Sequence, residues 1–169
     1  MLYQYLLKPL LFKIEPEAVH DFFCATGEWL GRSFLGRWLV AAVYGYRGKN
    51  LGRTVDGNFY RTPIMLAAGF DYNGRLTRIL PSLGLGGAEV GSVTARPCAG
   101  NRPPRLTRLP LSESIIVNKG LRNDGVDKVI TRLKAAPKVR GFVVGVSIAP
   151  PIDGQVVSVA DSIADYAAS

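Results

Sequence analysis

The residues from Pro63 to Asp127 constrain the fold most strongly, because they alternate between strand and helix patterns. Ile64–Ala68 is a short apolar run that stops at a glycine, and Ala88–Val93 is a second such run. Between them, Asn73–Leu83 carries apolar residues at helical spacing. A strand, a helix and another strand in this order predict an α/β protein with a parallel sheet and helical crossovers.

Small residues stand at the carboxyl ends of both predicted strands, as Ala67-Ala68-Gly69 and as Gly91-Ser92. Ligands bind at this end of the strands in α/β barrels and in open parallel sheets. A lone glycine there more often only ends a strand, because glycine is a common turn residue. Two consecutive ends of this kind, followed by a basic loop, favour a bound cofactor that carries a phosphate.

Composition limits the classes of protein to which the chain can belong. A length of 169 residues with 47% apolar and 20% charged residues predicts one globular domain. Cys24 and Cys98 stand far apart without metal-ligand spacing, which predicts reduced thiols and no zinc site. We expect no signal peptide after Met1–Ile14 and no transmembrane helix, because Gly141–Ile152, the longest uncharged run, is much shorter than ~20 residues.

The formal charge of +8 comes mainly from two clusters of basic residues that contain no acid. Five basic residues lie between Trp29 and Val55, and four arginines lie in Arg96–Arg108. Neither cluster shows a helix-turn-helix, zinc-finger or RNA-binding pattern, so no nucleic-acid partner is expected. The first cluster suits an anionic membrane surface, and the second suits phosphate or carboxylate ligands.

The amino-terminal segment predicts three helices. Leucines and isoleucine recur at helical spacing up to Ile14, Pro16 opens a second helix, and a third extends to Ala42. Aromatic residues on one side of the last helix, with arginines at its edges, fit the headgroup region of a membrane. Periodicity alone favours packing against the rest of the protein. His20 has no second histidine at ligand spacing and is expected to be structural.

The remaining elements follow from turn residues and periodicity. Asp56-Gly57 predicts a hairpin and places the end of the helical segment near Gly48–Leu51. Further predicted elements are a small hairpin of Arg105–Leu109 with Ser114–Val117, a helix at Gly125–Ala135, a strand at Phe142–Ile148 and a helix at Gln155–Ala168.

Three strings in this sequence resemble a known family, namely AAGFDYNG, GGAEVGSVTARPCAGNRPPRLTRLP and NKGLRNDGVD. They are similar to the opening βα units of dihydroorotate dehydrogenases, and LLFKIEPEAVHDF is similar to the amino-terminal extension of the quinone-using class 2 branch. The resemblance runs from about Tyr5 to about Ile148. It implies a TIM (β/α)₈ barrel with only the first three βα units present. Residues 1–50 would be a helical, membrane-associated extension, and residues 51–169 would be the incomplete barrel.

The resemblance implies FMN-dependent oxidation of dihydroorotate to orotate in pyrimidine biosynthesis, with quinone as acceptor. The enzyme would be peripheral, at the cytoplasmic face of the cell membrane. The catalytic base of the family lies near an N-x-S-x-P-N motif after the fourth strand, and these 169 residues contain no such motif. Cys98 lies in an earlier loop, so no catalytic residue is assigned. Since a full barrel takes ~250 residues, we expect the chain alone to be an inactive amino-terminal fragment.

The resemblance also assigns ligand-binding residues, none of them to a metal. The implied FMN-binding residues are Ala67, Ala68, Gly69, Ser92, Asn118 and Ser147. The implied substrate-binding residues are Tyr72, Asn118, Lys119, Gly120 and Leu121.

The chain departs from the family pattern at several of these positions. Tyr72 replaces a lysine that lies beside the flavin and the orotate carboxylate, and a phenol supplies no positive charge. Ser147 replaces an asparagine. The family spacing N-x-x-G is shorter here, so either one residue is missing after Asn118 or Val117 occupies its position. Lys119, like the nearby Arg122, either compensates for the missing lysine or, more commonly for such residues, is solvated surface.

Two other functions fit these departures. The chain is then either a non-catalytic membrane-surface or flavin-binding relic of this scaffold, or part of a flavin barrel oxidoreductase with a different small substrate. An N-x-S-x-P-N motif downstream of Ser169 would favour the enzyme.

Overall fold

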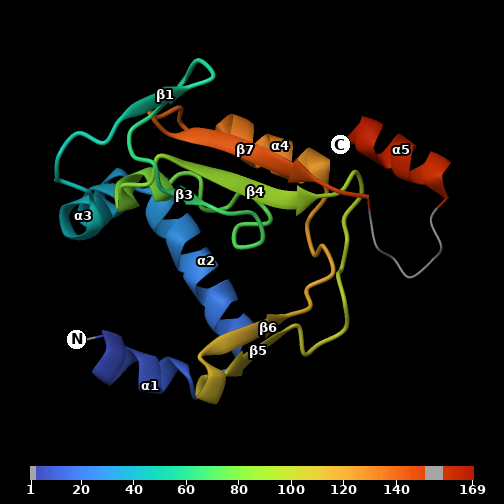
Figure 1. The fold of residues 1–169 in the computed structure, drawn as a ribbon, viewed down its shortest axis with the longest axis horizontal. Coiled ribbons are helices and arrows are strands. Elements are labelled where there is room, and N and C mark those ends of the chain that lie inside the picture. The colour runs from blue at the N-terminus through green and yellow to red at the C-terminus, as the bar shows by residue number, and fades with distance from the viewer. Residues whose placement is uncertain (1–2, 151–157) are drawn as a thin grey trace.

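The computed structural model describes residues 3–150 and 158–169, and its amino-terminal part is helical (Figure 1). The helices there are the π-helical turn η1 (Tyr3–Leu7), α1 (Lys8–Leu11), α2 (Pro16–Arg32) and α3 (Phe34–Tyr44). The Glu15 carboxylate caps α2 by accepting the Glu17 N–H at 3.0 Å, and Pro16 occupies the first turn. The three helices predicted from the sequence are confirmed.

A parallel sheet of three strands forms the centre of the fold. The strands are β3 (Met65–Leu66), β4 (Gly87–Val93) and β7 (Val143–Ile148), in the order β3-β4-β7. Both neighbouring pairs are parallel, and α4 (Val126–Ala135) lies on the crossover from β4 to β7. The predicted parallel α/β arrangement is therefore confirmed.

Two antiparallel hairpins stand outside this sheet. The first pairs β1 (Arg53–Val55) with β2 (Asn58–Tyr60), and the second pairs β5 (Leu106–Leu109) with β6 (Ser114–Val117) through the short 3₁₀ turn η3 (Pro110–Ser112). Both hairpins were predicted. The last helix, α5 (Val159–Ala168), lies within the helix predicted at Gln155–Ala168, whose residues 155–157 lie outside the described part of the chain.

The helix predicted over Asn73–Leu83 is wrong, because this segment is a series of turns that ends in the 3₁₀ helix η2 (Leu80–Leu83). The buried Asp71 carboxylate accepts the N–H groups of Arg75 and Leu76 at 2.8 and 2.7 Å, which fixes a turn. Gly74 is in the left-handed region at φ 68°. The apolar side chains that suggested a helix are nevertheless buried: Leu76, Ile79 and Leu80.

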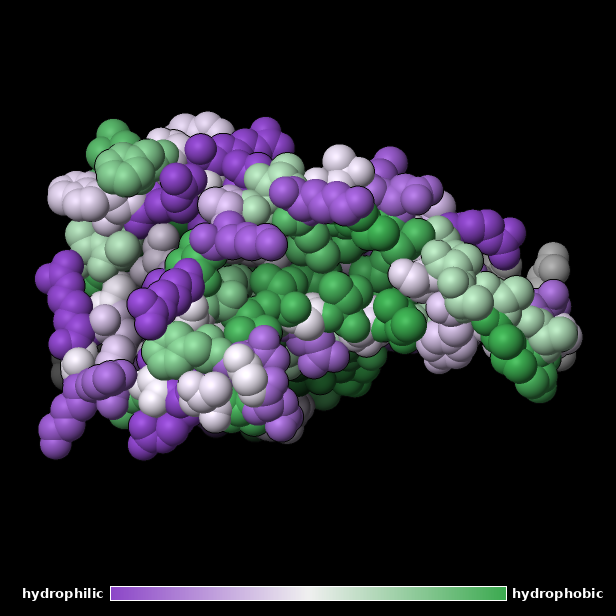
Figure 2. Space-filling view, turned by 90° about the horizontal axis from the view of Figure 1, so that it is seen from above, coloured by the Kyte–Doolittle hydropathy of each residue, from purple (hydrophilic) through white to green (hydrophobic). Residues whose placement is uncertain are grey.

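One face of the sheet is only partly covered. Ala88 and Val90 project to the same face of β4 and are fully buried. Ala88 belongs to an apolar cluster that contains Cys24 of α2, and Val90 belongs to a second cluster that contains Val129 of α4. Their partners on β7, Val144 and Val146, share this face but remain 39% and 45% exposed. In Figure 2 hydrophobic side chains accordingly gather in the middle of the surface that contains β7.

Helix α2 extends in space from the β5–β6 hairpin, which it contacts through β5, to the sheet (Figure 1). It packs closely at two glycines, since a Cβ added at Gly27 would lie 2.6 Å from Leu76 Cδ2 and one at Gly31 would lie 3.0 Å from Arg78 Cβ. Larger residues there would push α2 away from the loop that follows β3. In the described part of the chain, no helix combines the length and the apolar character needed to cross a membrane.

Candidate functional site

The backbone that follows β3 is hydrogen-bonded to the backbone of β4. Ala67, Ala68 and Gly69 follow β3, and the Gly69 N–H donates to the Gly91 carbonyl at 2.8 Å. Gly69 has φ 95°, which favours glycine, and a Cβ added there would meet no described atom within 4 Å. Ala67 is exposed. This strand end therefore offers uncovered backbone beside open space.

Hydroxyl groups from the other two strands meet at the same end of the sheet. Ser92 Oγ of β4 lies 2.8 Å from Ser147 Oγ of β7. The approach is close because Gly91 lacks a side chain: its Cβ would lie 2.4 Å from the Ser147 carbonyl oxygen. The structure thus brings together five of the predicted FMN-binding residues, from Ala67–Gly69, Ser92 and Ser147.

Asn118, the sixth, is held elsewhere by the loop that follows β4. Its Oδ1 accepts from Asn101 Nδ2 at 2.6 Å, and its N–H donates to the Arg105 carbonyl at 2.8 Å. Val117, the last residue of β6, pairs with Leu106 of β5, so Asn118 is the first residue beyond β6. Asn118 is exposed, and its described hydrogen bonds connect it to this loop rather than to the serines.

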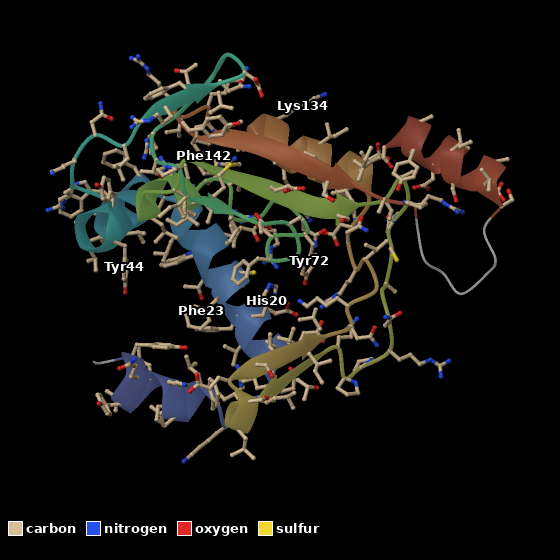
Figure 3. All side chains as sticks on the ribbon, viewed as in Figure 1. His20, Phe23, Tyr44, Tyr72, Lys134 and Phe142 are labelled. Atoms are coloured by element: carbon tan, nitrogen blue, oxygen red, sulfur yellow. The ribbon has the colours of Figure 1, made fainter. Side chains whose placement is uncertain are left out.

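Tyr72 faces α2 rather than the strand ends. Its hydroxyl donates to Asp21 Oδ1 at 3.3 Å, and its ring stacks on His20 with centroids 5.7 Å apart (Figure 3). Burial and the negative charge of Asp21 raise the pKa of Tyr72 to about 12, so the phenol is protonated at neutral pH. His20 Nε2 also lies 2.9 Å from the Phe70 carbonyl, which agrees with the structural role predicted for His20.

A charged cluster connects α2 with the two loops around the β5–β6 hairpin. Glu17 is 8% exposed and binds Arg105 Nε at 3.0 Å and Arg122 Nη1 at 2.8 Å. Arg122 also lies 3.4 Å from Asp21. Burial raises the pKa of Asp21, but the hydrogen bond from His20 and the charge of Arg122 outweigh it, so the pKa lies below its usual value.

The predicted substrate-binding residues after Asn118 lie beside this cluster. Lys119 Nζ lies 4.8 Å from the centre of the Tyr72 ring, and its accessible area is less than 1 Å². Gly120 has φ 64° and packs against Asn101, while Leu121 is half-buried with φ 57°. Neither Lys119 nor Arg122 is freely solvated surface, because the Nζ atom of Lys119 is buried and the half-buried Arg122 is ion-paired.

The cluster was not predicted, although the sequence of α2 carries a signal for it. Glu17, His20, Asp21 and Cys24 recur at intervals of three and four residues, which places them on one side of a helix. A polar stripe of this kind needs partners, and the arginines of the following loops supply them. Cys24, at the end of the stripe, is buried, and its burial and the charge of Asp71 raise its pKa to about 11.

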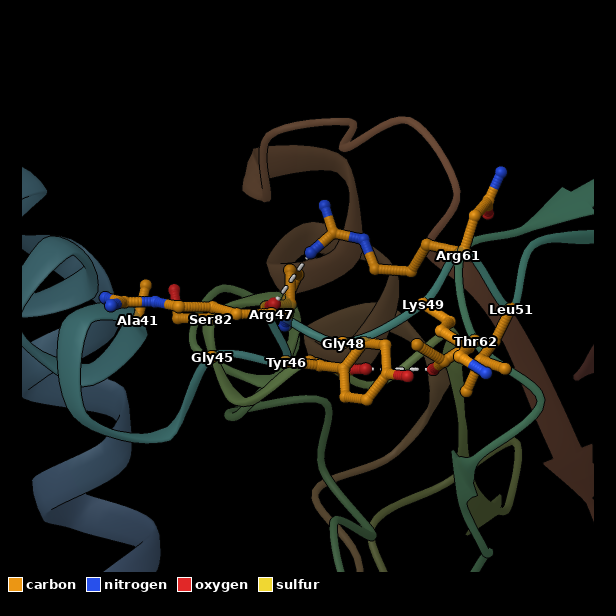
Figure 4. A pocket seen from close by; sticks show the side chains of 13 residues that line it. Ala41, Gly45, Tyr46, Arg47, Gly48, Lys49, Leu51, Arg61, Thr62 and Ser82 are labelled. Atoms are coloured by element: carbon orange, nitrogen blue, oxygen red, sulfur yellow. Dashed lines mark hydrogen bonds between the residues drawn. The ribbon is translucent and has the colours of Figure 1, made fainter.

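A hollow lies at the opposite end of the strands (Figure 4). It has a volume of about 450 Å³ and is lined by residues that precede β3 and β4, including Thr62 and Gly84, and by Arg47 and Lys49. It is therefore separate from the strand ends at Gly69. Within the described residues, histidine, cysteine and carboxylate side chains form no group of three that suits a metal ion.

Comparison with known proteins gives consistent matches. Residues 50–169 match the dihydroorotate dehydrogenase family model. The chain is 42% identical over 143 residues to the dihydroorotate dehydrogenase (quinone) of Alkalilimnicola ehrlichii, covering 85% of this chain and 40% of that protein. The dihydroorotate dehydrogenase (quinone) of Acinetobacter baumannii is 37% identical over 161 residues, which cover 95% of this chain and 45% of that protein. The chain thus spans less than half the length of these curated relatives.

A solved structure gives the same result. The dihydroorotate dehydrogenase of Eimeria tenella in complex with ferulenol superposes with a TM-score of 0.64 at 30% identity. The superposition covers 88% of this chain and 39% of that one.

Proposed function

The chain belongs to the dihydroorotate dehydrogenase family, and we propose that it works within a full-length enzyme that oxidises dihydroorotate to orotate. The proposed acceptor is a quinone, as the names of the relatives state for those proteins. The proposed cofactor is FMN, which accepts a hydride from the substrate when bound. The observation that carries this proposal is the meeting of Ala67–Gly69, Ser92 and Ser147 beside open space.

These strand ends fit a flavin. The uncovered backbone at Ala67 and Gly69 lets a flat ring lie against the chain, because neither residue presents a bulky side chain. Ser92 and Ser147 bond to one another and can each exchange this bond for one to the edge of the ring. Asn118 would contribute after releasing Asn101. The base that takes the substrate proton would come from residues outside this chain.

The amino-terminal helices support a peripheral membrane contact and a quinone entrance. Phe34 and Trp38 of α3 are 77% and 56% exposed, and basic residues follow at Arg47 and Lys49. An exposed aromatic face beside cations suits the headgroup region of an anionic membrane. Arg108 donates to the Leu11 carbonyl and so holds the end of α1 against β5. The proposed location, the cytoplasmic face of the cell membrane, follows from the resemblance to the quinone-using branch of the family.

A second candidate, a flavin barrel with a different small substrate, is favoured by one observation. The Tyr72 hydroxyl is bonded to Asp21 of α2, so the residue at the position of the family lysine does not present its polar end to the strand ends. Such an enzyme would hold flavin but would fail to form orotate.

The test uses the full-length protein. We expect a purified enzyme that contains about one FMN per chain and forms orotate when supplied with dihydroorotate and a quinone. Ala67→Leu should lose most of the flavin, because the added side chain fills the space for the ring, while Ala99→Leu on an exposed loop should retain it. A colourless protein would refute the proposal, and a flavoprotein inactive towards dihydroorotate would favour the second candidate.

A further inference from the structure

The charged cluster beside Tyr72 contains more positive than negative charge. Glu17, Asp21, Arg105 and Arg122 of this cluster, together with the adjacent Lys119, carry two negative and three positive formal charges. The excess of one positive charge lies between α2 and the loop after β6. An excess charge in a partly buried site is costly unless an anion joins the cluster.

The four carboxylate oxygens of the cluster already have partners. Glu17 Oε1 and Oε2 bind Arg122 and Arg105, respectively. Asp21 Oδ2 lies 3.4 Å from Arg122, and its Oδ1 accepts from the Tyr72 hydroxyl and lies 3.1 Å from His20 Nδ1. Both carboxylates are therefore bound by partners other than Lys119.

Lys119 carries the charge that lacks a direct partner. Its Nζ is buried and has no hydrogen-bond acceptor within residues 3–150 and 158–169. Burial lowers the pKa of Lys119, and the charges of Glu17 and Asp21 only partly oppose this shift. An ammonium group can donate three hydrogen bonds, so Lys119 can bind an anionic ligand once its side chain turns out of this enclosed position over Tyr72.

The position of Lys119 connects it with the missing family lysine. Its ammonium group lies over the face of the Tyr72 ring, at 4.8 Å, and the Tyr72 hydroxyl points away to Asp21. The ring thus supports a cation close to the position from which the family lysine extends. His20 holds the adjacent chain at Phe70, one residue beyond Gly69, so this arrangement borders the proposed flavin site.

We propose that Lys119 binds the carboxylate of the substrate, in place of the lysine that the family carries at position 72. This inference rests on the proposed function, because it takes the ligand to be a pyrimidine that bears a carboxylate. Arg122 is less suited to this role, since it is already paired with both Glu17 and Asp21.

The test measures orotate binding to the full-length enzyme with oxidised FMN, followed by the change in flavin absorbance. Lys119→Met should raise the Kd about 10- to 150-fold, which corresponds to one charge-assisted hydrogen bond. Lys119→Arg should retain most of the affinity. Tyr72→Lys combined with Lys119→Met should restore the Kd to within about fivefold, because a charge-assisted bond is regained. Lys134→Met, on the exposed side of α4 away from Tyr72, is the control (Figure 3).

Three results would overturn the inference. An unchanged orotate Kd in Lys119→Met, with an active parent enzyme, would refute it without affecting the proposed function. A loss that the Tyr72→Lys combination fails to restore, with flavin content intact, would show that Lys119 acts by holding the loop. A parent enzyme that neither binds orotate nor oxidises dihydroorotate would refute both proposals.

Discussion

Replacing Glu17 by glutamine should loosen α2 from the rest of the protein, because this one carboxylate binds two arginines. The Glu17 side chain is 10% accessible, that of Arg105 is 16% accessible and that of Arg122 is 33% accessible. Removing one partner of a fully buried ion pair costs roughly 3–5 kcal/mol. Arg122 is partly solvated and keeps Asp21, so we expect a loss near the lower limit, about 3 kcal/mol.

A loss of this size raises the opening equilibrium of α2 on the order of 100-fold. Amide hydrogen exchange of Pro16–Arg32 in the full-length protein measures this change directly. Glu28→Gln on the same helix is the matched comparison. Its partners Arg32 and Arg75 are 68% and 32% accessible, so its loss should stay near or below about 1 kcal/mol. Equal exchange rates in the two variants would refute the reasoning from burial.

Three further outcomes are expected. Removing residues 1–47 from the full-length enzyme should abolish sedimentation with anionic vesicles and reduction of long-chain quinones while flavin is retained, and unchanged sedimentation would contradict the membrane proposal. The midpoint temperature of unfolding should fall progressively as the pH drops below about 4, and a midpoint that stays constant from pH 7 to 3 would contradict this. The sign follows because Asp21 and Glu28, despite burial, have pKa values below 3.8 and 4.5 through their hydrogen bonds and positive neighbours, so their contribution is present above those values and lost below them. Residues 1–169 alone should self-associate and bind no flavin, since β7 leaves an open edge and exposed apolar residues; a yellow monomer in size-exclusion chromatography would refute this.

The regular elements were predictable because each carries a local signal. The short apolar run Ala88–Val93 identified β4, the Asp56-Gly57 pair identified the first hairpin, and Pro16 identified the start of α2. The turns after β3 were not predictable from periodicity. Leu76, Ile79 and Leu80 follow a helical pattern because they are buried, but the backbone there is set by the Asp71 carboxylate.

The candidate site was predictable only as far as short motifs extend. The small residues at Ala67–Gly69 and the serines at 92 and 147 meet at one end of the sheet, as the family motifs imply. The environment of Tyr72 depends on Asp21 and Lys119, which lie 51 and 47 residues away in sequence. Contacts between such distant segments leave no local pattern, so their pairing required the three-dimensional structure.

The ion pairs of Glu17 join residues that are far apart in sequence, and this separation affects the order in which the protein folds during synthesis. Glu17 binds Arg105 and Arg122, which follow it by 88 and 105 residues. At a synthesis rate of about 5–20 residues per second, α2 leaves the ribosome roughly 5–20 seconds before its last partner. During this interval the side of α2 that carries Cys24 and Gly31, both buried in the folded structure, has no sheet to lie beside. A nascent chain of this protein therefore presents this side of α2 to chaperones before the sheet can cover it.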